Sequence, residues 1–187
     1  MQALHGMDLP QPRVAPSSFV CEGCIEGKQQ PLPFPVDKAT CATKPLKLVH
    51  SDICSPTETT SIGAVKYFVS FIDDFSSKIW IFPIKLKNEC FDKFNVFKAF
   101  VNNQCKKKMK MMLLDNGDEF MSNQFGEFLK KKGIARQKST PYTPEQNGVA
   151  KRANQTIVAM ARCMLHAQNL NLDLWAEAMV NAVCTSN

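Results

Sequence analysis

Strand-like and helix-like patterns alternate from Leu46 onward, and this alternation most limits the folds that the chain can adopt. Short β-branched and aromatic runs predict strands, whereas apolar residues recurring every three or four positions predict helices. The resulting order of strand, strand, strand, helix, strand, helix, strand, helix, helix is typical of an α/β layered fold with a mixed sheet. The predicted strands are 46–53, 65–72, 79–84, 109–114 and 134–137, and the predicted helices are 88–104, a short helix ending at Gly133, a long helix beginning near Thr143, and 172–183.

The long helix has the clearest local signals. Thr143 can cap its start, Pro144 suits the first helical position and Gln146 follows three residues after the cap. Apolar residues at spacings of three and four predict its buried stripe, and a second set shares a face about opposite that stripe. The predicted stripe is Val149, Ala153, Ile157, Met160, Ala161 and Met164, and the opposite set is Lys151, Gln155, Val158 and Arg162.

Asp73 and Asp74 lie in the segment 73–77, between two strand-like runs. This arrangement predicts an antiparallel hairpin, and we interpret both acids as turn residues.

Residues 1–45 differ from the rest of the chain because prolines are frequent and periodic apolar residues are scarce. We therefore expect an irregular lead-in over 1–45 and a globular unit over 46–187. The chain stops at Asn187 within or just after a predicted helix, so we expect this unit to be truncated at its C-terminus.

The composition is that of a globular protein, with 44% hydrophobic and 21% charged residues among 187. No apolar run is long enough to span a membrane, and no secretory signal begins the chain, so we expect an intracellular protein. Its cysteines should then be reduced. Four of them stand singly among apolar residues and are expected to be small buried side chains: Cys90, Cys105, Cys163 and Cys184.

The formal net charge of +6 and the pI near 8.9 favour a polyanionic partner. Lysines at 106–108, 110 and 130–132 carry much of the excess. Each run can equally be a solvated helix end, so charge by itself permits nucleic acid without requiring it.

Asp52 and Asp115 each follow an apolar strand-like run. Acids at the ends of neighbouring strands can converge on a divalent cation, because such ions prefer carboxylate oxygens. Two such ions can hold the attacking and leaving oxygens of a phosphoryl transfer. Acids at strand ends are also common caps and turn formers, and the pair alone does not decide between these interpretations.

Five ordered motifs resemble the integrase segment of copia-type (Ty1/copia) retrotransposon polyproteins. The resemblance covers most of the chain, from Cys21 to Asn187. The matching segments are 21–28 (CEGCIEGK), 50–54 (HSDIC), 71–76 (FIDDFS), 114–120 (LDNGDEF) and 141–150 (PYTPEQNGVA).

The resemblance implies an RNase H-like fold with a mixed five-stranded sheet. It also implies a site in which two aspartates and one glutamate hold two Mg²⁺ or Mn²⁺ ions, which serve DNA-end trimming and the joining of that end to target DNA. Asp52 and Asp115 match the two aspartates. The glutamate is expected after 35 intervening residues, at the position that Lys151 occupies.

Lys151 is therefore expected to impair catalysis. An ammonium group offers only donors and repels a cation. Each unit-charge interaction is worth ~4 kcal/mol at ~4 Å and an effective dielectric near 20, so exchanging −1 for +1 is severe. We do not expect Glu119 or Glu145 to substitute, since both match positions outside the triad. A non-enzymatic DNA-binding remnant and a still active nuclease using another acid stay open as alternatives.

Cys21 and Cys24 match the cysteines of the zinc module that the resemblance implies. Its paired histidines should lie upstream, where His5 stands alone. A structural zinc ion takes four ligands, and nothing in the spacing requires Cys41 and His50 to complete a set. We expect a remnant of the module without Zn²⁺.

DNA is the partner that the resemblance implies, as both element ends and target, with a homo-oligomer as the acting form. Phosphate contacts are expected from Lys151, Arg152, Gln155 and Arg162. The alternative is that these residues form a solvated helix face, and the resemblance favours DNA. The expected location is the nucleus, or a cytoplasmic particle before import.

Overall fold

The computed structural model describes residues 41–187 except 57, 115–122 and 139–147. Contacts divide the chain into Met1–Val36 and Asp37–Asn187, and the described residues all belong to the second unit. The proline-rich lead-in expected over 1–45 lies almost wholly outside the described residues.

A five-stranded mixed sheet forms the centre of this unit, as predicted. Its strands lie in the order β3-β2-β1-β4-β5. β1 pairs with β2 and β2 with β3 in antiparallel fashion, whereas β1 with β4 and β4 with β5 are parallel. The strands are β1 (Leu48–Cys54), β2 (Tyr67–Asp73), β3 (Ile79–Ile84), β4 (Met111–Leu114) and β5 (Ala135–Lys138).

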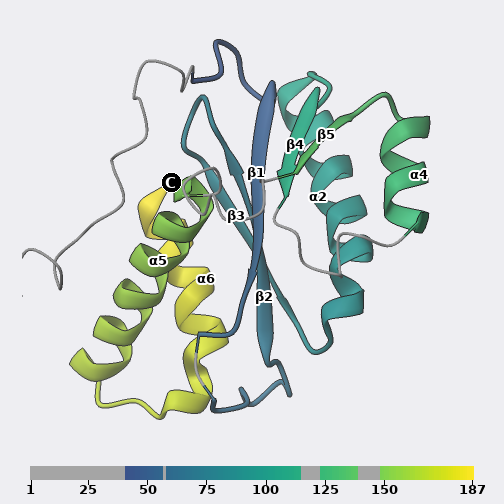
Figure 1. The fold of residues 1–187 in the computed structure, drawn as a ribbon. Coiled ribbons are helices and arrows are strands. Elements are labelled where there is room, and N and C mark those ends of the chain that lie inside the picture. Colours follow the sequence, from purple (N-terminus) through teal and green to yellow (C-terminus); the bar gives the residue numbers. More distant parts are fainter. Residues whose placement is uncertain (1–40, 57, 115–122, 139–147) are drawn as a thin grey trace, which may run out of the picture. The chain divides into compact units, whose positions relative to one another are not determined.

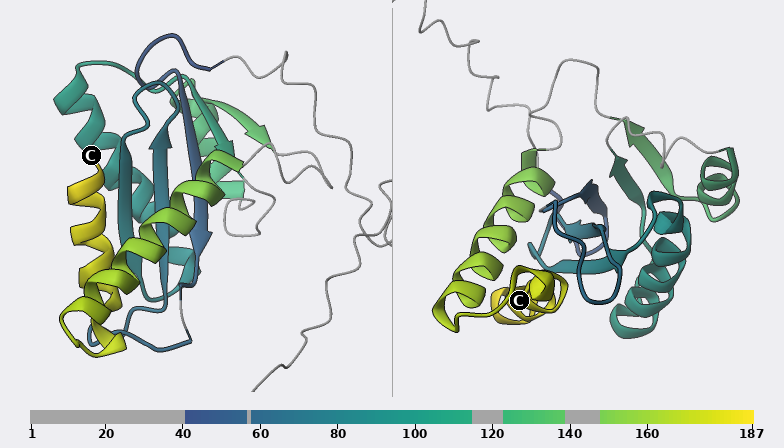
Figure 2. Two further views of the ribbon diagram at one scale, coloured as in Figure 1. Left: turned by 90° about the vertical axis from the view of Figure 1, so that its left-hand side faces the viewer. Right: turned by 90° about the horizontal axis from the view of Figure 1, so that it is seen from below.

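Helices cover both faces of the sheet (Figures 1 and 2). α2 and α4 pack on one face, whereas α5 and α6 pack on the other. This layered arrangement confirms the predicted α/β class and the predicted order of elements. The helices are α2 (Cys90–Cys105), α4 (Asn123–Lys131), α5 (Gly148–Ala167) and α6 (Trp175–Ser186), with short 3₁₀ helices η2 (Lys87–Glu89) and η4 (Leu172–Leu174).

Aromatic rings fill the core between the sheet and α2. Phe71 of β2 stacks on Phe97 of α2 with ring centroids 4.4 Å apart and planes 6° apart. Cys90, Phe94 and Val101 are buried on the same side of α2, at the helical spacing seen in the sequence. Burial of these rings anchors α2 to the sheet through the hydrophobic effect.

The stripe predicted for α5 is correct at its centre and displaced at its flanks. Ile157 and Ala161 are buried as predicted, but Leu165 and the polar Asn154 are buried as well. The other four predicted positions are only half-buried, because α5 contacts both the sheet and α6 and its apolar surface is divided between them; they are Val149, Ala153, Met160 and Met164.

The β2–β3 turn is built on Asp73 and Asp74, as the hairpin interpretation predicted. Asp73 Oδ1 accepts the Leu46 N–H at 2.8 Å, and its Oδ2 accepts the N–H and hydroxyl of Ser76 at 3.1 and 2.7 Å. Asp74 Oδ1 lies 2.9 Å from His50 Nε2. Asp73 thus ties the segment before β1 to the turn, and Asp74 ties β1 itself to the turn.

The expectation of four buried cysteines is wrong for three of them. Cys90 is buried, whereas Cys105, Cys163 and Cys184 are exposed. Cys105 is the last residue of α2, and Cys163 and Cys184 lie on helix faces turned away from the sheet, so apolar sequence neighbours did not imply burial. No helix in the described part of the chain is long and apolar enough to cross a membrane.

Candidate functional site

Asp52 occupies the face of the sheet that α5 covers. Side chains alternate between the two faces of a strand, so His50, Asp52 and Cys54 share one face of β1. Asp52 is 8% exposed and pairs across the sheet with Ser70, whose hydroxyl donates to the Asp52 carbonyl at 3.3 Å. The pairing of β1 with β2 therefore places the Asp52 carboxylate beneath α5. The groups that contact this carboxylate determine what it can bind.

Asn154 is the partner from α5. Its side chain is buried, and its Nδ2 donates a hydrogen bond of 3.1 Å to Asp52 Oδ2. The sequence prediction missed this residue. The available signal was its position three residues after Lys151, which places both on one side of a helix.

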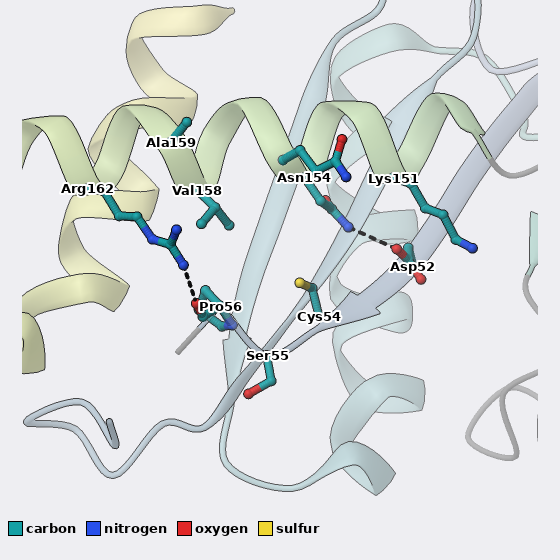
Figure 3. A pocket seen from close by; sticks show the side chains of 10 residues that line it. Asp52, Cys54, Ser55, Pro56, Lys151, Asn154, Val158, Ala159 and Arg162 are labelled. Carbon is teal, nitrogen blue, oxygen red and sulfur yellow. Dashed lines mark hydrogen bonds between the residues drawn. The ribbon is translucent and has the colours of Figure 1, made fainter. Parts of the chain in front are cut away.

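A pocket of about 420 Å³ opens beside this pair (Figure 3). Lys151 and Arg162 project from α5 toward β1 and the segment that follows it. The structure brings together all four residues predicted to share a face of the helix. The lining residues are Asp52, Cys54, Ser55, Pro56, Lys151, Asn154, Gln155, Val158, Ala159 and Arg162.

Arg162 closes one end of the pocket. Its Nη2 donates to the Pro56 carbonyl at 3.1 Å, which links α5 to the segment after β1. The remaining guanidinium donors leave this side chain able to contact a second group. Arg152, the other predicted DNA contact, is exposed and does not line the pocket.

The charges in the described part of the pocket are one carboxylate, Asp52, and two cations, Lys151 and Arg162. Burial raises the pKa of the Cys54 thiol, and the negative charge of Asp52 raises it further. The raised pKa keeps the Cys54 thiol neutral. Because the two cations outnumber the single carboxylate, the described lining of the pocket suits an anionic ligand better than a cationic one.

Asp115 lies outside the described residues, as do Glu119, Glu145, His5, Cys21 and Cys24. The last described residue before Asp115 is Leu114, which pairs with Ser51, the residue before Asp52. The parallel pairing of β1 and β4 thus brings the chain positions that precede the two aspartates side by side.

The described side chains do not fit a pair of divalent cations. Among them, no group of three or more His, Cys, Asp or Glu is arranged to hold a metal ion. The pocket instead offers one carboxylate that accepts from an amide, together with an ammonium group. Cys41 is exposed and His50 Nε2 lies 2.9 Å from Asp74 Oδ1, whereas the cysteines of the expected zinc module, Cys21 and Cys24, lie outside the described residues.

The fold is that of integrase catalytic cores. The intasome structure of simian T-cell lymphotropic virus, in complex with a PP2A regulatory subunit, matches 88% of this chain and 56% of that chain with a TM-score of 0.66 at 19% identity. The HTLV-2 integrase catalytic core domain in complex with magnesium, in a trimeric form, matches 75% of this chain and 84% of that chain with a TM-score of 0.55, also at 19% identity.

Sequence relationships specify the family. The integrase core domain family model matches residues 42–144, and the chain belongs to that family. The integrase resemblance that the motifs indicated is thus confirmed, and the chain is similar over most of its length to Pol polyproteins of transposons, Ty1 elements among them.

The relatives are polyproteins of transposons. The retrovirus-related Pol polyprotein from transposon TNT 1-94 of Nicotiana tabacum is 41% identical over 87% of this chain, and that from transposon RE2 of Arabidopsis thaliana is 32% identical over 89%. The truncated Ty1-A Gag-Pol polyprotein of Saccharomyces cerevisiae is 30% identical over 73% of this chain. The chain spans only 12%, 11% and 12% of the length of these relatives, respectively.

Proposed function

We propose that this integrase core binds DNA at the α5 pocket and that Lys151 impairs its metal-dependent polynucleotidyl transfer. The observation that carries the proposal is the location of Lys151, which lines the same pocket as Asp52. If Lys151 lay far from Asp52, its charge would not affect a metal ion bound at that carboxylate. This lysine brings a positive charge into the pocket itself.

The proposed metal-binding acids are Asp52 and Asp115. The pairing of Ser51 with Leu114 supports this assignment, since each residue directly precedes one of the acids. When bound, Mg²⁺ or Mn²⁺ would supply Lewis-acid activation of water and of a DNA 3′-hydroxyl. The HTLV-2 core was solved with magnesium, which supports the kind of ion for a functional site of this fold.

Lys151 opposes that site electrostatically. A carboxylate would attract a divalent cation, whereas an ammonium group repels it by ~4 kcal/mol per unit charge at ~4 Å and an effective dielectric near 20. Asn154 adds a second effect, because its amide occupies a lone pair of Asp52 Oδ2. The impairment that we propose is therefore local and leaves the fold intact, since Lys151 is exposed.

DNA binding does not depend on the third acid. Lys151, Arg162 and Gln155 line the pocket and can contact phosphate oxygens, while Arg152 lies exposed on the same helix. Phosphate contacts position DNA without reading its sequence. The second candidate function is a non-enzymatic DNA-binding remnant. The observation that favours it is that two cations, Lys151 and Arg162, line the pocket with a single described carboxylate.

Assembly and location are further parts of the proposal. The simian virus relative of this fold was solved as an intasome, and the HTLV-2 core was solved as a trimer. We propose that the present core also acts as a homo-oligomer on element ends and target DNA, and that it does so in the nucleus, after any cytoplasmic particle stage.

Calorimetry with Mg²⁺ and Mn²⁺ tests the central claim, using the unmodified chain, Lys151→Glu and Lys151→Gln. The glutamine variant removes the positive charge without adding a carboxylate, so it separates repulsion from ligation. We expect Lys151→Glu to bind two ions and to join labelled DNA ends to a target duplex, and the unmodified chain to do neither. The variant Asp52→Ala in the Lys151→Glu background is the control for metal dependence.

Strand transfer by the unmodified chain would overturn the proposed impairment and require another third ligand. Absence of metal binding in all three proteins would contradict the claim that Lys151 is what prevents metal binding. DNA binding that neither EDTA nor Asp52→Ala changes, with no transfer in any variant, would support the non-enzymatic candidate.

A further inference from the structure

The two lysine runs that the sequence places apart meet at one edge of the fold. The segment 106–110 leads into β4, and the segment 130–134 leads into β5. The parallel pairing of these strands begins with the Ala135 N–H donating to the Lys110 carbonyl at 2.8 Å. Both runs therefore approach the sheet side by side. We call Lys98, Lys106, Lys107, Lys108, Lys131 and Lys132 the basic edge.

Phe128 of α4 is the centre of this surface. The Nζ atoms of Lys98 and Lys132 each lie 5.7 Å from the centroid of its ring. Lys98 comes from α2 and Lys132 follows α4, so two elements direct ammonium groups to one aromatic ring. Cation–π attraction partly offsets the repulsion between them.

The ammonium groups also interact electrostatically. Partial burial lowers the pKa of Lys98, and the positive charges of Lys132 and Lys108 lower it further. Among the described residues, no carboxylate lies within ion-pair distance of the basic edge. The nearby turn acids Asp73 and Asp74 are engaged by backbone N–H groups and by Ser76 and His50. An anion bound here would relieve like-charge repulsion.

Helix ends give the competing structural explanation. α2 and α4 both end at this edge, and lysines near a helix C-terminus stabilise the helix through its dipole. Lys106, however, caps α2 with φ +50°, a left-handed conformation that favours glycine or asparagine. Dipole stabilisation also does not require lysines of two helices to converge on one ring.

We propose that the basic edge binds the phosphate backbone of duplex DNA, as a second contact surface separate from the α5 pocket. This inference rests on the proposed function for the identity of the polyanion. α2 and α4 cover the face of the sheet opposite α5, and the edge lies at the start of β4, whereas Leu114, next to the site, ends that strand.

The backbone here disfavours recognition as an extended basic peptide. Met109 is 3% exposed, and Lys110 is fixed on both sides, through its N–H to Leu46 at 3.0 Å and through its carbonyl to Ala135. A receptor that recognises lysines in an extended peptide needs the backbone around Met109 and Lys110 to be free of other hydrogen bonds. A folded surface of ammonium groups suits phosphates that succeed one another along a duplex.

Fluorescence anisotropy of the full 187-residue chain with a labelled duplex, measured across NaCl concentrations, tests the proposal. The edge variant is Lys107→Gln/Lys108→Gln/Lys132→Gln. The matched control is Lys66→Gln/Lys78→Gln/Lys85→Gln, which removes three charges from exposed lysines elsewhere. The pocket variant is Lys151→Gln/Arg162→Gln. Urea unfolding of each variant shows whether the fold is retained.

We expect the edge variant to lower the slope of log Kd against log salt by about 3 and to weaken binding at 0.1 M salt by at least about tenfold. The control should change both quantities much less. Edge and pocket effects should add when combined, since the surfaces are separate.

Equal DNA binding by the edge and control variants would overturn the inference, and a weakened pocket variant in the same experiment would leave the proposed function standing. No binding by the unmodified chain would overturn both. Poly-L-glutamate that displaces the duplex as readily as unlabelled DNA of equal charge would overturn DNA as the occupant of the edge. Loss of stability without loss of binding would favour the helix-dipole explanation instead.

Discussion

The side-chain amide of Asn154 donates a 3.1 Å hydrogen bond to Asp52, although the two residues are 102 positions apart in the chain. Both side chains are buried, at 4% and 8% exposure. The bond fixes the start of α5 over β1 and sets the direction in which the carboxylate points. It also places Lys151, one helical turn before Asn154, at the mouth of the same pocket.

Asn154→Ala should destabilise the protein. A buried carboxylate would lose one of its hydrogen-bond donors, and an unsatisfied group of this kind costs about 1–3 kcal/mol. Urea unfolding monitored by circular dichroism gives the change in midpoint at constant slope. Gln155→Ala, at the exposed neighbouring position that also lines the pocket, should change stability by about 0.5 kcal/mol or less. Equal effects of the two substitutions would contradict a structural role for the Asn154–Asp52 bond.

Phe97→Ala should be among the more damaging single changes. Phe97 is fully buried and stacks on Phe71, so its removal leaves a cavity between α2 and the sheet. Truncation of a core phenylalanine costs about 3–5 kcal/mol. Phe100→Ala is the control on the same helix, because Phe100 is 43% exposed and should cost about 1 kcal/mol or less. Thermal or urea unfolding of both variants measures the difference.

Cys54 should react slowly with iodoacetamide, because its raised pKa keeps the thiolate fraction small. Asp52→Asn removes the charge that raises this pKa further, so alkylation of Cys54 should become faster at the same pH. Peptide mapping by mass spectrometry follows Cys54 separately from the exposed cysteines. An alkylation rate at Cys54 that is unchanged by Asp52→Asn would argue against the electrostatic coupling.

The same shift predicts a pH dependence of stability. The folded-state pKa of Cys54 lies above its unfolded value, so the unfolded chain releases this proton first as pH rises. The contribution of Cys54 is therefore fully present below the unfolded pKa and is lost as pH rises toward the raised folded value. Cys54→Ala should flatten this part of the profile of unfolding free energy against pH, and Cys163→Ala, at an exposed position, is the control.

Lys151→Gln, Arg152→Gln and Arg162→Gln should each lower the salt slope of DNA binding by about 1, as expected when one phosphate contact is removed. Fluorescence anisotropy with a labelled duplex gives the slope, and Lys78→Gln, on the exposed turn before β3, is the control. Arg162→Gln should have an added effect on the pocket, since it also breaks the bond to Pro56. Slopes that none of the three variants changes would place DNA away from α5.

Local sequence patterns were enough to predict the order and type of every described α-helix and β-strand. The β3 bounds, Ile79–Ile84, agree with the prediction, and the buried positions of α2 follow the predicted helical period. These features depend on side-chain alternation and on the 3.6-residue turn, which are properties of neighbouring residues. The motifs around Asp52 and Asp115 specified the family for a similar reason, because their residues are close together in the chain.

The tertiary structure alone decided which distant residues meet. The sequence analysis assigned no role to Asn154, and only the docking of α5 on β1 made it the partner of Asp52. Three cysteines with apolar neighbours proved exposed, because burial depends on what packs against a helix face. The two lysine runs converge because β4 and β5 pair in parallel from Lys110 and Ala135 onward. Strand register and helix docking are set by the whole core, so a local pattern could identify Lys151 as anomalous but could not place it in a pocket with Asp52.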